Sequence, residues 1–256
     1  MEKKAVIIEI NRVCNYKCIF CNVPNNIGEK KEISLELFKE RIEKYDHVGI
    51  SGGEPLLHKS LKDMILLCKN KASIVLATNL SFFPEWLVNE ELNCIKERFY
   101  VQVNLPTVDN ELYKNITGTK INVDVILRNI DKLMQKKRNI VINVVVTKLN
   151  SSLSHLLAIT NTFSEMIKKN KLEKENFFLL RFHPIIAMNK SHRELIDKKV
   201  FSIFDEYMKK VKMLYDFPIS FVDRFHIEKL LKGKTNTDYI TLEGNVYPSL
   251  FHAWID

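Results

Sequence analysis

The sequence is poor in cysteine and has no long hydrophobic run. Only five cysteines occur among 256 residues, and three of them crowd into one short string, so they cannot all pair as disulfides. No signal peptide and no stretch long enough to cross a membrane are visible, and an apolar content of 46% is ordinary for a chain with a sizeable core. We therefore expect one domain in a reducing cytoplasm, without a membrane partner.

Acidic residues are also in deficit, which leaves a net charge of +8. Lysines dominate the excess and are spread in short groups, such as Lys168-Lys169 and Lys209-Lys210, at polar faces or ends of predicted helices. The simplest interpretation is a solvated surface. The alternative is attraction to an anionic substrate such as a nucleotide, a phosphosugar or RNA, although no RNA-binding motif is present. We therefore allow an anionic substrate and do not expect a nucleic-acid partner.

Cys14, Cys18 and Cys21 form the string C-N-Y-K-C-I-F-C after an apolar run at the N-terminus. A [4Fe–4S] cluster has four irons, each of which usually takes one cysteine thiolate. Three thiolates in one loop leave one iron without a protein ligand, so the spacing favours a cluster whose open iron binds a substrate or cofactor. A structural zinc site is the alternative, but zinc usually takes four protein ligands and no fourth is nearby.

Strand-like and helix-like segments alternate through most of the chain. Strands are predicted at 5–10, 47–50, 73–77, 99–105, 140–147 and 177–183, and helices at 35–45, 60–70, 84–95, 123–137, 153–169 and 190–215. Six βα units favour an α/β fold with a parallel sheet buried on both faces and rolled into a barrel. Catalytic groups in such barrels lie at the carboxyl ends of the strands, where the cysteine string, Gly52-Gly53 and Thr78-Asn79 fall.

The last forty residues break this alternation. A strand is predicted at 218–222, a short helix at 224–231 and a hairpin at 239–248 around Glu243-Gly244-Asn245. We therefore divide the chain into a core barrel, residues 1–215, and a short C-terminal appendage, residues 216–256. The appendage is expected to close the open side of the barrel or to cover the active site.

The cysteine string resembles the C-x3-C-x2-C signature of the radical S-adenosylmethionine (SAM) enzymes. The string S-G-G-E-P at 51–55 follows about thirty residues later and resembles the G-G-E-P motif of that family. The resemblance implies a partial (β/α)6 TIM-like barrel and one [4Fe–4S] cluster held by Cys14, Cys18 and Cys21. It also implies SAM on the open iron, cleaved with one electron to a 5′-deoxyadenosyl radical that takes hydrogen from the substrate. A reductant such as flavodoxin or ferredoxin would supply the electron.

The same resemblance assigns further residues to SAM. The turn at Gly52 and Gly53 is expected to contact its amino group, with Glu54 and Pro55 beside it, and Phe20 to lie beside the adenine. The string V-N-L-P-T-V-D at 103–109 resembles the MoaA-like branch of the family. By that resemblance the remaining SAM residues are Thr78, Asn79, Asn104, Arg181 and Ile186. Arg181 is equally suited to a structural ion pair.

The chain also departs from the MoaA-like branch. The last forty residues contain no cysteine, and Ser249 stands where auxiliary-cluster domains have one, so no second cluster is expected. Ile7, Gly49 and Thr147 take the places of basic residues that hold a purine triphosphate, which disfavours GTP cyclisation. We therefore expect a small-molecule substrate, such as a sugar, a nucleotide or an antibiotic precursor. Epimerisation or crosslinking of a ribosomally made peptide and RNA modification are the alternatives.

Five other side chains invite a functional interpretation. Cys68 and Cys94 fall in predicted helices away from the barrel mouth, so neither is expected to donate a hydrogen atom to a substrate radical. His58 is expected to support the loop after Glu54-Pro55. His183 suits either a structural or a pocket-lining role, and Tyr239 is a candidate for contact with the substrate.

Overall fold

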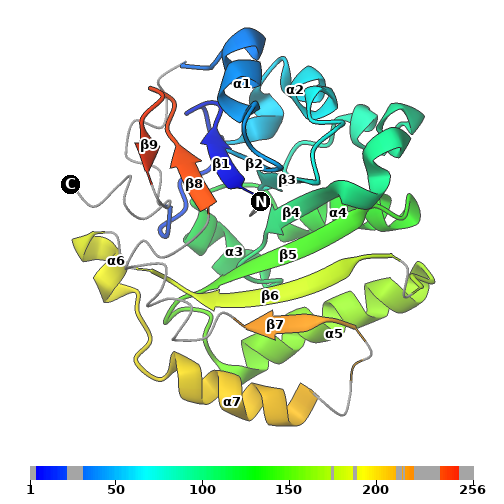
Figure 1. Ribbon diagram of the computed structural model, residues 1–256. Coiled ribbons are helices and arrows are strands. Elements are labelled where there is room, and N and C mark those ends of the chain that lie inside the picture. Colours follow the sequence, from blue (N-terminus) through cyan, green and yellow to red (C-terminus); the bar gives the residue numbers. More distant parts are fainter. Residues whose placement is uncertain are drawn as a thin grey trace.

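The computed structural model describes residues 4–21, 31–173, 176–186, 189–211, 215, 217–221 and 237–247. Within these residues, strands form one sheet in the order β7-β6-β5-β4-β3-β2-β1-β8-β9 (Figure 1). The strands are β1 Ala5–Glu9, β2 His47–Ser51, β3 Ser73–Thr78, β4 Phe99–Asn104, β5 Asn139–Val146, β6 Phe178–Pro184, β7 Ile219–Phe221, β8 Thr237–Ile240 and β9 Val246–Tyr247. The α-helices are α1 Leu35–Ile42, α2 Leu61–Leu67, α3 Asn110–Thr117, α4 Val123–Gln135, α5 Leu153–Lys169, α6 Lys190–Glu194 and α7 Val200–Val211.

The first six strands pair in chain order and are all parallel, with helical segments between them. The helices lie outside the curved sheet, so its concave side faces the interior of the molecule (Figure 1). This arrangement confirms the predicted α/β partial barrel. Short edge strands extend it further, because β7 pairs parallel with β6 and β8 pairs parallel with β1.

The predicted hairpin near the C-terminus is present. β8 and β9 are antiparallel, and Gly244 in the turn between them adopts a φ of +94°, a conformation that favours glycine. Side chains near the end of β1 hold this turn, since Glu9 Oε2 accepts from Leu242 N at 2.9 Å and Arg12 donates to Glu243 Oε2 at 2.7 Å. The hairpin therefore lies against the segment that leads into the cysteine string. The predicted helix at 224–231 lies outside the described residues, and the domain division at 215 stays a prediction.

The segment predicted as a helix at 84–95 forms two 3-10 helices, η2 Glu85–Val88 and η3 Glu90–Arg98. Side chains from the start of β5 explain the difference. Arg138 donates to Asn89 O at 2.7 Å and Asn139 donates to Lys96 O at 2.8 Å. These carbonyls are thus satisfied from outside the segment, which removes part of the advantage of a continuous α-helix.

The long helix predicted at 190–215 is broken into α6 and α7. Asp197 lies in the break, where its Oδ1 accepts from Lys199 N at 2.8 Å and its Oδ2 accepts from the Ser151 hydroxyl. An aspartate that accepts from a backbone N–H two residues ahead favours a turn over a continuing helix. A local side-chain contact with a distant loop therefore ends α6 and allows α7 to start anew.

The core lies mainly between the sheet and its helices. On β3 the outward residues Ile74 and Leu76 are fully buried, whereas the alternate residues Ser73, Val75 and Ala77 keep some accessible surface. Such alternation is the period of a strand with two different faces. The concave face of the sheet is therefore not packed solid, and a cavity lies along it.

Candidate active site

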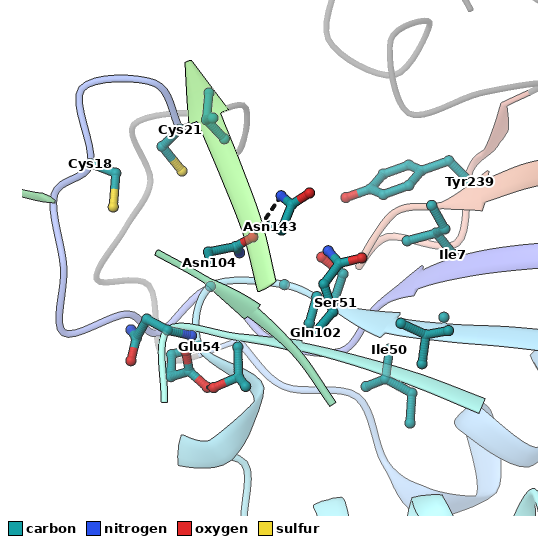
Figure 2. Close-up of a pocket in the computed structure, with 18 of the residues that line it drawn as sticks. Ile7, Cys18, Cys21, Ile50, Ser51, Glu54, Gln102, Asn104, Asn143 and Tyr239 are labelled. Carbon is teal, nitrogen blue, oxygen red and sulfur yellow. Dashed lines mark hydrogen bonds between the residues drawn. The ribbon is translucent and has the colours of Figure 1, made fainter. Parts of the chain in front are cut away.

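A cavity of about 570 Å³ lies inside the barrel and opens around the cysteine string (Figure 2). The structure brings almost all of the predicted site residues to it. Those that line it are Cys14, Cys18, Phe20, Cys21, Gly52, Gly53, Glu54, Thr78, Asn79, Asn104, Arg181 and Ile186. Pro55 is the exception, because it is buried at the start of the 3-10 helix η1 Pro55–Leu57.

The cysteine string forms a loop that is tied to the end of α3. Lys17 N donates to Thr117 O at 2.9 Å, and Ile19 N donates to Ile116 O at 3.0 Å. Gly118, the residue after α3, has a φ of +62°, and a Cβ there would lie 2.8 Å from Lys17 O. A glycine is therefore required both by the left-handed end of the helix and by the close approach of the loop.

The three thiols line one cavity and form a donor set of cysteine sulfurs. Within the part of the chain that the structure describes, no three histidine, cysteine or acidic side chains are placed to share a metal ion. Thiolates on a single zinc would lie roughly 4 Å apart, given Zn–S bonds of about 2.3 Å. The thiolates of a [4Fe–4S] cluster bind separate irons, so they need no common centre. The donor set therefore fits a cluster with three protein ligands.

Burial makes the free thiols hard to ionise. It raises the pKa of Cys14 to about 11, although the Tyr16 N–H, 3.4 Å from the sulfur, lowers it slightly. Burial raises the pKa of Cys18 further still, and the neighbouring Cys21 adds to the effect. Thiolates are the ligands of iron, so the loop gains its negative charges only when metal binds and protons leave.

The Gly-Gly turn, Gly52 and Gly53, packs directly on the segment before the cysteine loop. Gly53 N donates to Asn11 O at 2.8 Å, and Glu54 N donates to Val13 O at 2.7 Å. A Cβ on Gly53 would lie 2.3 Å from Val13 O, and one on Gly52 would lie 2.5 Å from Asn11 O. Both glycines are thus needed for contact between protein segments, whatever they contribute to a cofactor.

Glu54 joins the turns that follow β2 and β3. Its carboxylate accepts from Thr78 Oγ1 at 2.6 Å, Asn79 N at 2.7 Å and Leu56 N at 3.0 Å. Burial raises the pKa of Glu54 to about 7, and the hydrogen bonds from Thr78 and Asn79 oppose this rise. Because every donor faces an oxygen, the site is built for a carboxylate. Both oxygens are engaged by the protein, so the Glu54 side chain positions the two turns.

Replacing Glu54 by glutamine is expected to lower the free energy of unfolding by about 2 kcal/mol, since one oxygen becomes an NH2 group that faces a donor. Urea unfolding under anaerobic conditions measures the change. Glu111→Gln is the control, because Glu111 is exposed and pairs with Lys114 one turn along α3. Equal stability of the two variants would show that the carboxylate does not hold the turns together.

Leu80 directly follows the Thr78-Asn79 turn and has a backbone conformation typical of glycine. Its φ is +53°, a left-handed conformation that is uncommon for a leucine. The Thr78 hydroxyl accepts from Leu80 N at 2.9 Å, and Asn129 donates to Leu80 O at 2.9 Å. The side chain is fully buried. These hydrogen bonds and the burial of the side chain therefore offset the conformational free-energy cost of the left-handed backbone at Leu80. They stabilise the turn that follows β3.

A row of polar side chains crosses the far wall of the cavity. Asn104, Asn143 and Arg181 are partners in register on β4, β5 and β6. Asn143 donates to Asn104 Oδ1 at 3.0 Å and lies 3.1 Å from His183 Nε2 (Figure 2). Arg181 has no ion-pair partner among the described residues, and burial lowers its pKa. Its guanidinium is therefore available to the cavity.

Several cavity residues were not predicted from the sequence. The main ones are Ser51, Gln102, Asn143 and the pair His47 and Ser73. A signal existed, because polar residues at alternate positions of otherwise apolar strands mark an inward face that is not a packed core.

The remaining side chains singled out in the sequence differ in whether they reach the cavity. Cys68 is buried at the end of α2 and Cys94 is exposed on η3, and neither lines the cavity. His58 supports its loop as expected, with Nε2 3.0 Å from Ile33 O and Nδ1 accepting from Ser60 N at 3.1 Å. Tyr239 and His183 line the cavity. Ser249 lies outside the described residues.

His183 makes stability depend on pH. Burial lowers its pKa from 6.5 to about 4, so the unfolded chain binds the proton more tightly than the folded one. Its contribution is therefore complete above pH 6.5 and is lost as the pH falls toward 4, by at most about 3 kcal/mol. We expect the unfolding free energy of His183→Gln to vary less with pH between 4 and 6.5 than that of the wild type. His155, which is partly exposed on α5 and does not line the cavity, supplies the control His155→Gln, and equal pH slopes for both variants would contradict the expectation.

Comparison with known protein families shows which family the chain belongs to. The radical SAM superfamily matches residues 8–152, which include the cysteine loop, the Gly-Gly turn and β1 to β5. The chain belongs to the radical SAM superfamily. It is therefore an enzyme, and the cofactors of its superfamily are a [4Fe–4S] cluster and SAM. Within the described residues, no helix is both long and apolar enough to traverse a membrane.

Curated relatives lie in the MoaA-like branch, as the resemblance implied. A probable GTP 3′,8-cyclase of Archaeoglobus fulgidus is 32% identical over 165 residues, which cover 61% of this chain and 54% of that protein. One of Methanococcus aeolicus is 34% identical over 154 residues, which cover 52% and 47%. The chain spans about half the length of the curated relatives it matches.

Solved structures confirm the fold. Streptococcus suis SuiB bound to the precursor peptide SuiA superposes with a TM-score of 0.76 at 14% identity, over 99% of this chain and 61% of that chain. The structure of anSMEcpe with bound AdoMet gives a TM-score of 0.67 at 19% identity, over 98% and 74%. At such identity the likeness shows the partial barrel alone.

Proposed function

We propose that Cys14, Cys18 and Cys21 each bind one iron of the cluster and that SAM occupies the cavity beside them. The cluster held by the three thiols would supply the electron that cleaves a C–S bond of SAM and gives a 5′-deoxyadenosyl radical. The residues lining the same cavity would hold the small-molecule substrate from which that radical would take a hydrogen atom. The observation that carries the proposal is the meeting of the three thiols, the Gly-Gly turn and the Thr78-Asn79 turn around one cavity.

The cavity offers a matching group to each part of SAM. Arg181 is a guanidinium without a described ion-pair partner, which suits a carboxylate. Asn104 both donates and accepts, and its place beside Asn143 limits how its amide turns. Phe20 and Ile186 are apolar and partly accessible at the cavity, which suits the faces of an adenine. Gly52 and Gly53 line the cavity, and the backbone of this turn would contact the amino group.

The protein's other task is to keep water away from the radical. The helices and the outward faces of the strands bury Ile8, Ile50 and Leu76 completely, so the barrel wall is tightly packed. The chemistry itself is that of the cofactors, and the chain contributes binding, orientation and exclusion of solvent. A one-electron reductant such as flavodoxin or ferredoxin and a reducing cytoplasm belong to the same proposal.

Among small molecules, a nucleotide has support from the relatives called GTP 3′,8-cyclase. Cyclisation of GTP itself is disfavoured, because Ile7 and Gly49 put no charge at the cavity positions where that branch carries basic residues. The second candidate is modification of a ribosomally made peptide. It is favoured by the superposition on SuiB, whose structure contains its precursor peptide SuiA.

The test is anaerobic reconstitution with iron and sulfide, followed by SAM and dithionite. We expect about four irons per chain and the formation of 5′-deoxyadenosine. A preparation that holds its four irons and never cleaves SAM would contradict the proposal. Zinc bound to the three thiols in anaerobically purified protein would do the same.

A further inference from the structure

The cavity continues past the cysteine loop to the amino ends of the strands. Ala5, His47, Ser73 and Thr237 line it there, and they are partners in register on β1, β2, β3 and β8. The next row toward the cysteine loop consists of Ile7, Gly49, Val75 and Tyr239. We call these two rows the deep chamber. It lies at the opposite end of the strands from the three thiols.

Three of the eight inward positions of the deep chamber carry small residues. Interiors of closed barrels are normally filled by layers of bulky branched side chains. Here Ala5, Gly49 and Ser73 occupy inward positions, and a Cβ on Gly49 would already lie 3.2 Å from Ile7 Cγ1. The outward residues of the same strands, such as Val48 and Ile74, are fully buried and supply the packing. Small inward residues thus leave space inside the barrel, while the outward residues of the same strands keep the wall tightly packed.

The polar groups of the deep chamber are hydroxyls and an imidazole. His47 Nδ1 and Ser73 Oγ lie 2.7 Å apart, so each fixes the orientation of the other. The Thr237 hydroxyl belongs to the same row, and the Tyr239 hydroxyl points into the cavity (Figure 2). Next to the deep chamber, toward the carboxyl ends of the strands, Gln102 on β4 pairs with Ala77 and adds an amide group to the cavity (Figure 2). Hydroxyl, amide and imidazole groups can each donate and accept, which matches a ligand that does both.

Formal charge is confined to the other end of the cavity. Among the described lining residues, the carboxylate is Glu54 and the guanidinium is Arg181. Glu54 follows the Gly-Gly turn and has both oxygens engaged, whereas Arg181 lies in the row of Asn104 at the carboxyl end of β4. Among the described residues of the deep chamber, no lysine or arginine faces a phosphate and no carboxylate faces an ammonium group.

We propose that the deep chamber is the substrate subsite and that it binds a neutral, hydroxyl-bearing ring of the size of a monosaccharide. The proposal rests on the proposed function, because it takes SAM to occupy the end of the cavity next to the thiols. It narrows the substrate class to compounds with a sugar-like moiety at the reacting end.

Equilibrium dialysis of the protein loaded with cluster and SAM tests the proposal. The probes are three pools: neutral monosaccharides with uridine, the phosphate esters of the same compounds, and the corresponding amino sugars. Mass spectrometry of the retained compounds gives the result. We expect retention from the neutral pool, about tenfold weaker in Ser73→Ala, since one lost hydrogen bond of about 1.4 kcal/mol changes affinity tenfold. Gly49→Leu, which fills the chamber, is expected to abolish retention.

Ser202→Ala is the matched control, because the Ser202 hydroxyl binds Lys199 O on the exposed face of α7. Retention only of phosphates or of amino sugars, retention from no pool, or retention unchanged in Gly49→Leu and Ser73→Ala would each overturn the proposal. Formation of 5′-deoxyadenosine without any pool reports the proposed function separately. Its absence would refute the radical chemistry, while its presence without sugar retention would refute only the subsite.

Discussion

Replacing Cys18 by alanine is expected to reduce 5′-deoxyadenosine formation to background, a loss of about a thousandfold or more. Groups that act as one unit lose nearly all function when a single member is removed. In the function proposed above the three thiols are such a unit, because each would bind a different iron. Iron content and 5′-deoxyadenosine formed from SAM and dithionite, measured after anaerobic reconstitution, check this expectation.

Cys94→Ala is the matched control. Cys94 is exposed on η3 and does not line the cavity, so its variant should keep both the iron content and the cleavage of SAM. If the Cys18 variant retained a full cluster and wild-type cleavage, the cysteine loop would not be the cluster site. If both variants lost iron equally, general damage to the protein would explain the result.

Gly53→Ala is expected to have the second largest effect. A Cβ there would lie 2.3 Å from Val13 O and 2.7 Å from Val13 C, which are backbone atoms that cannot rotate away. Overpacking of this kind costs about 3 kcal/mol, so the turn and the start of the cysteine loop must separate. The hydrogen bonds from Gly53 N to Asn11 O and from Glu54 N to Val13 O would be lost as well. We expect lower unfolding free energy together with lower iron content.

Gly49→Ala is the control for Gly53→Ala, because it also replaces a cavity-lining glycine but without a clash against backbone atoms. The nearest atom to a Cβ on Gly49 is Ile7 Cγ1 at 3.2 Å, on a side chain that can shift slightly. This variant should lose less than about 1 kcal/mol and keep its iron. Urea unfolding and iron analysis of both variants decide the matter. Equal losses of unfolding free energy and iron in Gly53→Ala and Gly49→Ala would contradict the expectation. They would mean that the close contact between the Gly-Gly turn and the cysteine loop does not require a glycine at position 53.

The motif residues were predictable because each belongs to a short local string. Cys14, Cys18 and Cys21 lie within one loop, and Gly52 and Gly53 directly follow a strand that its apolar period predicts. Carboxyl ends of neighbouring parallel strands meet at one edge of a sheet, so the order of the strands already places these strings close together. That inference needs only local patterns and the rule of right-handed crossovers.

The reason for a motif residue was harder to predict than its place. The glycines of the turn were expected to make room for SAM, whereas their nearest constraints are the backbone atoms of Asn11 and Val13. Glu54 was expected beside SAM, whereas its carboxylate holds Thr78 and Asn79. Contacts between segments this far apart in sequence leave no local periodicity, so no window of the sequence reveals them.

The sequence by itself determined the βα order, the cysteine loop and the family, because strand period, helix period and ligand spacing are all local properties of the chain. Only the tertiary structure decided which face of each strand lines the cavity and where its charges lie. The tertiary structure alone places four residues in one row across neighbouring strands: Ala5, His47, Ser73 and Thr237. In the sequence the first and last of them, Ala5 and Thr237, are 232 positions apart. Register between distant strands is set by packing of the whole barrel, and that is a property of the folded molecule.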